Sequence, residues 1–338
     1  MRIGLLGAGR IGTFHATALA RTDGVDGLVI ADADPARAAA LAERLGARAA
    51  TAEAVFRSAD AVVIAAATPA HADLITEAAR KRLPTFCEKP VALDLDRTVR
   101  ALREVEASGT LLQMGFQRRF DAGFLAARDA LRAGRLGRVH TIRAVTSDAA
   151  PPPAEFLPLS GGLIRDCLVH DFDTVRWLTG REVAEVYARG SDNGAAFFRA
   201  AGDVDTAAVL LTLDDGTLVT ATATRYNGAG YDVRMELSGE RDQWVVGLDA
   251  RTPMTSAEPG GPGAPVRPWG GFLERFDAAY RAELAAFVRA ARGEVPNPCP
   301  GGEGLRALVV AEACELSRRE GRPVRPMEVA ERSGVPFP

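Results

Sequence analysis

The first 21 residues constrain the fold more than any other stretch of the sequence. Residues 2–6 are apolar after Arg2 and predict a short strand, which leads into Gly7-Ala8-Gly9-Arg10-Ile11-Gly12 and then a helical pattern over residues 13–21. In such a G-x-G-x-x-G turn the first glycine permits the tight turn, and the second lets the main chain approach a pyrophosphate. The third allows the helix to pack closely on the strand, and the helix N-terminus faces the anion. This context predicts a dinucleotide-binding unit.

A carboxylate ends the second predicted strand. That strand covers residues 27–31 and is followed by Asp32, 20 residues after the last glycine of the turn. An acid at this point accepts a hydrogen bond from the adenosine ribose 2′-hydroxyl. Asp34 adds negative charge and the nearest basic side chain is Arg37, so we expect NAD rather than NADP. The alternative is that Asp32 only caps the helix beginning near Pro35.

Helical and strand patterns then alternate. Helices are predicted over 35–45, 71–81 and 93–107, and apolar strands over 61–67, 84–87 and 111–115. This alternation is typical of an α/β domain with a doubly wound parallel sheet, the Rossmann arrangement, in which ligands bind at the carboxyl ends of the strands. The residues expected at those ends are Thr68, Glu88, Lys89 and Gln113.

Lys89 stands between Glu88 and Pro90 at such a strand end. A following proline disfavours an α conformation, so Lys89 is expected to be extended. Most lysines are solvated surface charges. Because Lys89 is expected at the carboxyl edge of the sheet, where ligands bind, we favour a position beside the nicotinamide instead.

A second candidate site lies between residues 161 and 173, in Gly-Gly-Leu-Ile-Arg-Asp-Cys-Leu-Val-His-Asp-Phe-Asp. Two glycines permit a tight turn, and a helix is expected to follow it. Asp166 and His170 are four residues apart, so in a helix they share one face. A carboxylate beside an imidazole fixes its tautomer and raises its basicity, which suits proton transfer from a hydroxyl. The alternative is a helix start with acidic residues and one satisfied histidine.

The composition bounds the remaining possibilities. The chain has 338 residues, 47% of them hydrophobic, and a net charge of −3. Two domains are expected, with no attraction to nucleic acid or anionic membranes. Four cysteines without a C-x-x-C pair, and no apolar run near the length of a membrane span, predict a cytoplasmic protein. Four histidines without paired spacing predict no metal site.

From about residue 120 the pattern changes. Successive strands are predicted over 139–147, 183–190, 204–213, 217–225, 231–239 and 242–248. Few helices separate them, which predicts an α+β domain with a large, open, mostly antiparallel sheet. Threonines at 220, 222 and 224 alternate with apolar residues, so one face is a candidate subunit interface. We therefore expect an NAD-binding domain at 1–119 and a substrate-binding and oligomerisation domain at 120–338.

The sequence resembles the Gfo/Idh/MocA oxidoreductase family, and within it the inositol 2-dehydrogenases. The matching stretches follow the family's order and lie at 7–12, 67–69, 88–90, 115–121, 151–153, 160–173 and 230–232. Residues 148–151 depart from the Asp-Pro-Ala-Pro of close relatives, so the resemblance defines the reaction type more closely than the substrate.

The resemblance implies roles for individual residues. It implies a catalytic trio of Lys89, Asp166 and His170. The implied contacts of NAD are Gly7, Gly9, Arg10, Ile11, Gly12, Asp32, Thr68, Pro69, His71, Glu88, Lys89 and Gln117. The implied contacts of the substrate are Lys89, Arg119, Ser147, Asp148, Asp166, His170 and Tyr231. It further implies a homo-oligomer, a tetramer or dimer, formed through the open sheet.

The expected activity is oxidation of a ring secondary alcohol by NAD, with myo-inositol converted to 2-keto-myo-inositol. One alternative is a dehydrogenase or ketoreductase for another cyclitol or a hexose, for example at C3. Two others are a glycosidase that uses NAD transiently and a non-catalytic regulator that senses NAD.

Overall fold

The computed structural model describes residues 1–335 and 337, so residues 336 and 338 of the expected second domain lie outside the described residues. The chain forms two compact units. The first contains residues 1–120 and 278–305, and the second contains residues 121–277 and the chain from Arg306 onward. Residues 278–305, which the sequence pattern had placed with the second domain, therefore cluster with the first.

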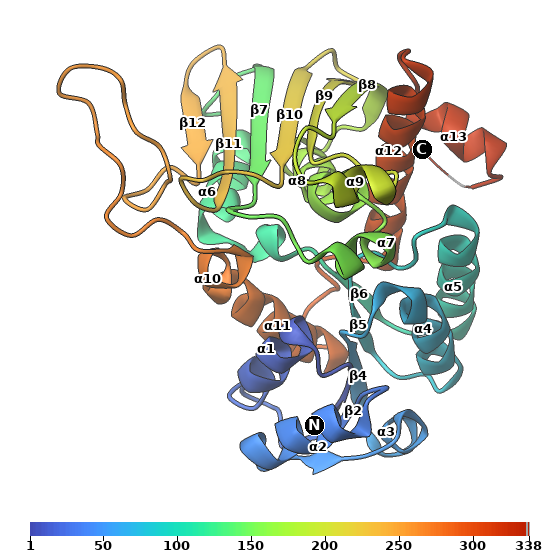
Figure 1. The fold of residues 1–338 in the computed structure, drawn as a ribbon. Coiled ribbons are helices and arrows are strands. Elements are labelled where there is room, and N and C mark those ends of the chain that lie inside the picture. The colour runs from blue at the N-terminus through green and yellow to red at the C-terminus, as the bar shows by residue number, and fades with distance from the viewer. Residues whose placement is uncertain (336, 338) are drawn as a thin grey trace. The chain divides into compact units, whose positions relative to one another are not determined.

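The first unit is built on a six-stranded parallel sheet, in the order β3-β2-β1-β4-β5-β6; Figure 1 labels β2, β4, β5 and β6 of this sheet. The strands are β1 (Arg2–Leu6), β2 (Gly27–Ala31), β3 (Arg48–Ala49), β4 (Ala61–Ile64), β5 (Thr85–Glu88) and β6 (Leu112–Gly115). The helices are α1 (Arg10–Leu19), α2 (Pro35–Leu45), α3 (Ala52–Ser58), α4 (His71–Arg80), α5 (Leu95–Ser108) and α11 (Asp277–Ala291). The predicted Rossmann sheet is confirmed.

Apart from the exposed Arg2, the central strands β1 and β4 are buried along their length, which is why they read as continuous apolar runs. One core cluster contains Ile3 and Leu5 of β1, Phe86 of β5, and Leu284 and Phe287 of α11. The rings of Phe86 and Phe287 lie 5.8 Å apart between centroids. This packing explains why a helix so late in the sequence belongs to the first unit.

The second unit contains a sheet in the order β12-β11-β7-β10-β9-β8. Its strands are β7 (Val139–Ser147), β8 (Val183–Ser191), β9 (Thr206–Leu213), β10 (Leu218–Thr224), β11 (Asp232–Gly239) and β12 (Gln243–Val246). Every pair is antiparallel except β7 with β10. The mostly antiparallel sheet expected from the sequence is therefore confirmed. Its helices are α6 (Ala122–Arg132), α7 (Leu157–Ser160), α8 (Val169–Thr179), α9 (Ala196–Ala200), α10 (Phe272–Arg275), α12 (Gly301–Glu320) and α13 (Pro326–Arg332).

The two faces of this sheet differ. Along β10, Val219 and Ala221 are buried while Thr220 and Thr222 are exposed. Figure 1 shows α6 and α8 against one side of the sheet. On the other side Leu210 remains 44% exposed. The period-2 pattern thus places a row of threonine and apolar side chains on an accessible face.

Near the C-terminus the chain forms α13, with Pro326 at its first position. Proline suits that position because its missing N–H has no helical partner there. A helix of seven residues is too short for apolar periodicity to reveal it. Within the described residues, no helix combines the length and apolar character needed to cross a bilayer.

Candidate active site

The glycine turn between β1 and α1 has three different environments. A Cβ on Gly7, whose φ is +107°, would lie 2.5 Å from main-chain atoms of Ala65 and Ala66. A Cβ on Gly12 would lie 2.0 Å from the Gly7 carbonyl oxygen. At Gly9 a Cβ would have no atom of the described residues within 4 Å. Packing therefore requires Gly7 and Gly12, whereas the space over Gly9 is open for a ligand such as a pyrophosphate.

Asp32 lies at the carboxyl end of β2 and contacts this turn. Its Oδ2 accepts the Ala8 N–H at 2.6 Å, and its Oδ1 accepts the Asp34 N–H at 2.8 Å. The side chain that caps α2 is Asp34, which accepts the Ala36 N–H at 3.0 Å. The alternative that Asp32 only caps this helix is therefore wrong, and its carboxylate belongs to the glycine turn.

His71 begins α4, directly after the short helix η1 (Thr68–Ala70), which contains Thr68 and Pro69. Its Nδ1 lies 2.8 Å from the Pro90 carbonyl oxygen and its Nε2 lies 2.9 Å from that of Ala66. Burial of the ring, which is 1% exposed, lowers the pKa of His71. A neutral ring has one N–H, so it donates to one of the two carbonyls at a time. The ring thereby joins the loops that follow β4 and β5.

Glu88 ends β5 and points at α1. Its Oε1 lies 2.6 Å from Nε2 of His15, whose side chain is fully buried. Lys89 follows immediately, and the peptide bond between Lys89 and Pro90 is cis. The His15–Glu88 contact anchors the end of β5, so Lys89 is placed at the carboxyl edge of the sheet as the sequence predicted.

Gln117 and Arg119 lie in η2 (Gln117–Phe120), just after β6, and both are buried. The Arg119 guanidinium donates to Glu303 at 2.9 Å and to the Pro298 carbonyl oxygen at 3.4 Å. Carboxylate pairing of this kind orients a buried guanidinium. Thus Arg119, expected to contact the substrate, makes these two contacts within the first unit.

In the second unit, several expected substrate residues gather at one end of the sheet. Ser147 at the end of β7 is opposite Asp232 of β11 and Thr224 of β10. The next residue, Asp148, donates its N–H to the Thr224 carbonyl at 2.9 Å. Tyr231 is buried and precedes β11. Ser147, Asp148 and Tyr231 therefore share a sheet end although the sequence separates them.

Asp166 and His170 follow the expected glycine turn, in which Gly161 and Gly162 have φ of +80° and +92°. The helix is not regular. Asp166 lies in a π-helical turn, η4 (Ile164–Leu168), and His170 lies in the first turn of α8. The regular helix predicted here is corrected to a π-turn joined to an α-helix. Such turns are rare and frequently occur at functional sites.

Sequence reasoning missed Arg225. Its guanidinium donates to Oδ2 of Asp166 and to Oδ2 of Asp148, each at 2.7 Å, and the residue is 3% exposed. The alternation along β10 contained the signal. Threonines at 220, 222 and 224 face outward, so residue 225 falls in step with the buried Ala221 and Ala223. An arginine on the buried face of a strand requires carboxylate partners.

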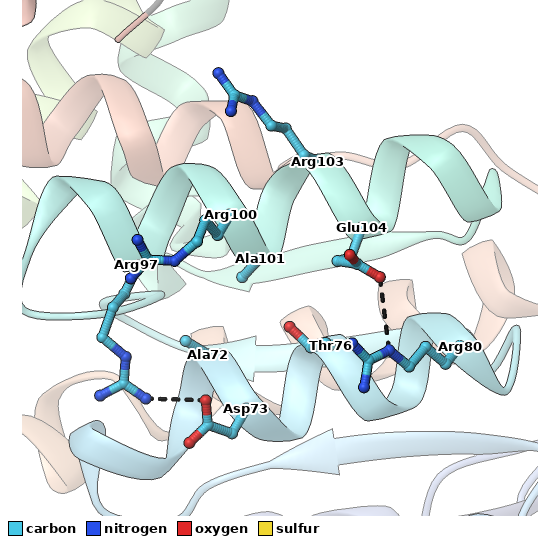
Figure 2. Close-up of a pocket in the computed structure, with 9 residues that line it drawn as sticks. All are labelled: Ala72, Asp73, Thr76, Arg80, Arg97, Arg100, Ala101, Arg103 and Glu104. Carbon is cyan, nitrogen blue, oxygen red and sulfur yellow. Dashed lines mark hydrogen bonds and ion pairs between the residues drawn. The ribbon is translucent and has the colours of Figure 1, made fainter. Parts of the chain in front are cut away.

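A groove on the first unit, between α4 and α5, is a different kind of surface (Figure 2). It is lined by Ala72, Asp73, Thr76, Arg80, Arg97, Arg100, Ala101, Arg103 and Glu104. Arg97 pairs with Asp73 at 3.0 Å and Arg80 with Glu104 at 3.6 Å. Figure 2 shows Arg103 extending away from α4. These side chains do not converge on a ligand position, and the groove is an ion-paired exposed surface.

Family models match both parts of the chain. The model of the oxidoreductase family with an NAD-binding Rossmann fold, GFO/IDH/MocA, matches residues 1–116. The model of the GFO/IDH/MocA C-terminal domain matches residues 124–245. Together they cover the glycine turn, Lys89, the π-turn and Arg225.

Individual proteins match over nearly the whole chain. Myo-inositol dehydrogenase Hyg17 of Streptomyces leeuwenhoekii is 40% identical over 332 residues, covering 96% of this chain and 100% of that protein. The crystal structure of a myo-inositol dehydrogenase from Corynebacterium glutamicum matches with a TM-score of 0.87 at 33% identity, covering 96% of this chain and 98% of the other. That of scyllo-inositol dehydrogenase from Lactobacillus casei, with bound NAD(H) and scyllo-inositol, matches with a TM-score of 0.88 at 26% identity, covering 97% of this chain and 99% of the other.

Proposed function

The chain belongs to the Gfo/Idh/MocA oxidoreductase family, and from this premise we propose that it oxidises a ring secondary alcohol of a cyclitol with NAD. The proposed substrate is myo-inositol, converted to 2-keto-myo-inositol (scyllo-inosose). The observation that carries this proposal is the 40% identity to a myo-inositol dehydrogenase, over the entire length of that relative and 96% of this chain.

The first unit is proposed to bind NAD, which when bound supplies the acceptor for the hydride that leaves the carbinol carbon. The residues fit this cofactor. The open space over Gly9 and the N-terminus of α1 suit a pyrophosphate, and the Asp32 carboxylate suits a ribose hydroxyl. With Asp34 beside it, Asp32 also disfavours a 2′-phosphate, so NAD is proposed over NADP.

Three side chains are proposed to act on the substrate hydroxyl. His170 accepts the hydroxyl proton, and Asp166 orients the imidazole and favours its charged form. The Lys89 ammonium stabilises negative charge that develops on the oxygen. Ser147, Asp148 and Tyr231, gathered at the end of the sheet, are proposed to bind the ring hydroxyls, together with Arg119.

Variants of the trio test this assignment. Positioned acid–base groups each contribute on the order of 10² to 10⁴ in rate. Lys89→Ala and His170→Ala are therefore expected to lower kcat by that factor while NAD affinity, measured by calorimetry, changes little. Variants that bind NAD normally and retain near wild-type turnover would refute the assignment.

A second substrate deserves the same assay. The structure of the Lactobacillus casei enzyme contains scyllo-inositol, which differs from myo-inositol only in configuration at one carbon. We propose scyllo-inositol as the alternative substrate of the same site. Comparing kcat/KM for the two isomers decides between them.

The exposed face of the second sheet is proposed to form a homo-oligomer, a tetramer or dimer. Leu210 and Leu218 are exposed on it beside Thr220 and Thr222, and a row of this kind is compatible with burial against a second copy. The protein is further proposed to be cytoplasmic, where its four buried cysteines would remain reduced.

A further inference from the structure

Arg225 is the buried cation of the second unit's candidate site. It immediately follows β10, and its main-chain N–H donates to the Asp205 carbonyl oxygen at 2.8 Å. Its two terminal nitrogens donate to two carboxylates, Asp148 after β7 and Asp166 in the π-turn, each at 2.7 Å. One guanidinium therefore joins three segments that are far apart in the sequence.

The charges around Arg225 are predominantly negative. Besides Asp148 and Asp166, the carboxylate of Asp203, which precedes β9, interacts electrostatically with the guanidinium. These neighbours raise the pKa of Arg225 far above its ordinary value despite its burial. The guanidinium is thus permanently charged, and a permanent cation favours the ionised form of each adjacent carboxylate.

We propose that Arg225 is a positioning residue of the dehydrogenase reaction, and this inference rests on the proposed function. It holds Asp166 ionised and fixed in the π-turn, so that Asp166 can orient His170. It also fixes Asp148 in the same cluster. Arg225 itself neither gives up nor accepts a proton in this role.

Removal of Arg225 is expected to change the pH dependence of the reaction. Without Arg225, Asp148 and Asp166 would lose the cation with which both pair, and one proton would be retained to higher pH. The loss of a nearby positive charge also favours the protonated imidazole of His170. Both effects move the acidic limb of the kcat/KM profile toward higher pH.

The test uses Arg225→Met, which keeps a long apolar side chain, and Arg225→Lys, which keeps the charge. For Arg225→Met we expect kcat/KM for myo-inositol to fall by about 10²-fold, because misplaced catalytic groups cost that much. We also expect the midpoint of the acidic limb of its kcat/KM profile to move to higher pH by about one unit or more. Arg225→Lys is expected to recover part of both effects, since an ammonium pairs with one carboxylate but lacks the two-pronged geometry.

A matched control is Arg176→Met. Arg176 is also buried and makes two contacts with one carboxylate, Glu182, at 2.7 and 2.8 Å. Both Met variants are expected to lose thermal stability, but Arg176→Met should keep the wild-type pH profile. A folded Arg225→Met variant whose profile superimposes on those of wild type and Arg176→Met would overturn the inference.

A second measurement does not depend on turnover. The chain has four histidines, so the imidazole signals can be assigned by NMR with His170→Ala as reference. The titration midpoint of His170 is expected to rise in Arg225→Met, and an unchanged midpoint would overturn the inference. Wild-type protein that oxidises no cyclitol would instead refute the proposed function, whatever the NMR result.

Discussion

Replacing the glycines of the β1–α1 turn one at a time separates fold from cofactor binding. Gly9→Ala and Gly12→Ala add the same methyl group three residues apart. At Gly12 the added Cβ would lie 2.0 Å from the Gly7 carbonyl oxygen, so the main chain must move. Overpacking of this kind costs about 1–3 kcal/mol, and rigid main-chain neighbours place Gly12→Ala at the upper end.

At Gly9 the added Cβ would meet no described atom within 4 Å, and the backbone, with φ of −70°, suits any L-residue. An alanine there reduces the freedom of the unfolded chain, which stabilises a protein by about 0.4–1 kcal/mol. The same methyl group would occupy the space that a pyrophosphate needs. Gly9→Ala is therefore expected to be at least as stable as wild type without NAD but to bind NAD at least about tenfold more weakly, or about 1.4 kcal/mol.

Chemical unfolding with and without NAD measures both quantities. At a NAD concentration of about 100 times the wild-type Kd, wild type gains about 2.7 kcal/mol of stability, and a variant with tenfold weaker binding gains about 1.4 kcal/mol. Wild-type NAD stabilisation in Gly9→Ala would refute the reasoning about the open space. Equal stability loss in Gly9→Ala and Gly12→Ala would refute the steric distinction.

Asp32→Ala should weaken NAD binding by about tenfold or more and reduce discrimination against NADP. Asp34→Ala should lower stability by about 1 kcal/mol, because a helix cap is lost, and should leave the cofactor preference near that of wild type. Calorimetry with both nucleotides measures the cofactor preference of each variant. Leu210→Glu, on the exposed sheet face, should lower the molar mass measured by light scattering, whereas Leu125→Glu, 40% exposed on α6, should not. Burial raises the pKa of Asp203 in the folded state above 3.8, so the folded state favours the protonated carboxyl. The protonated carboxyl therefore contributes stability, in full at pH values below the pKa of the unfolded state. That contribution is lost as the pH rises through the pKa of the folded state. Asp203→Asn should therefore exceed wild-type stability at neutral pH and lose that advantage as pH falls toward about 4 in urea unfolding experiments; an advantage independent of pH would contradict the cause assigned.

Local patterns were sufficient to predict the first sheet, apart from the two-residue strand β3, and its glycine turn. Period, glycine spacing and the carboxylate at Asp32 are all encoded within short stretches, and each stretch forms its element largely by its own residues. The capping alternative for Asp32 was excluded only by the structure, because the choice between Asp32 and Asp34 depends on where α2 begins.

Features that depend on distant segments were not predictable. The π-turn that contains Asp166 differs from an α-helix in hydrogen-bond spacing, which the residue pattern does not record. Arg225 forms its ion pairs with Asp148 and Asp166, which are 77 and 59 residues away in sequence. Likewise, α11 belongs to the first unit because Phe287 packs against Phe86, and helical periodicity does not predict this contact.

The most direct test of the central claim is NADH formation from myo-inositol by the purified protein, with NAD and NADP assayed in parallel and His170→Ala as the inactive reference. The account predicts steady NADH production with NAD, much slower reduction of NADP, and a loss on the order of 10² or more in the variant. Bound NAD with no NADH formed from myo-inositol, scyllo-inositol or any other cyclitol would contradict it.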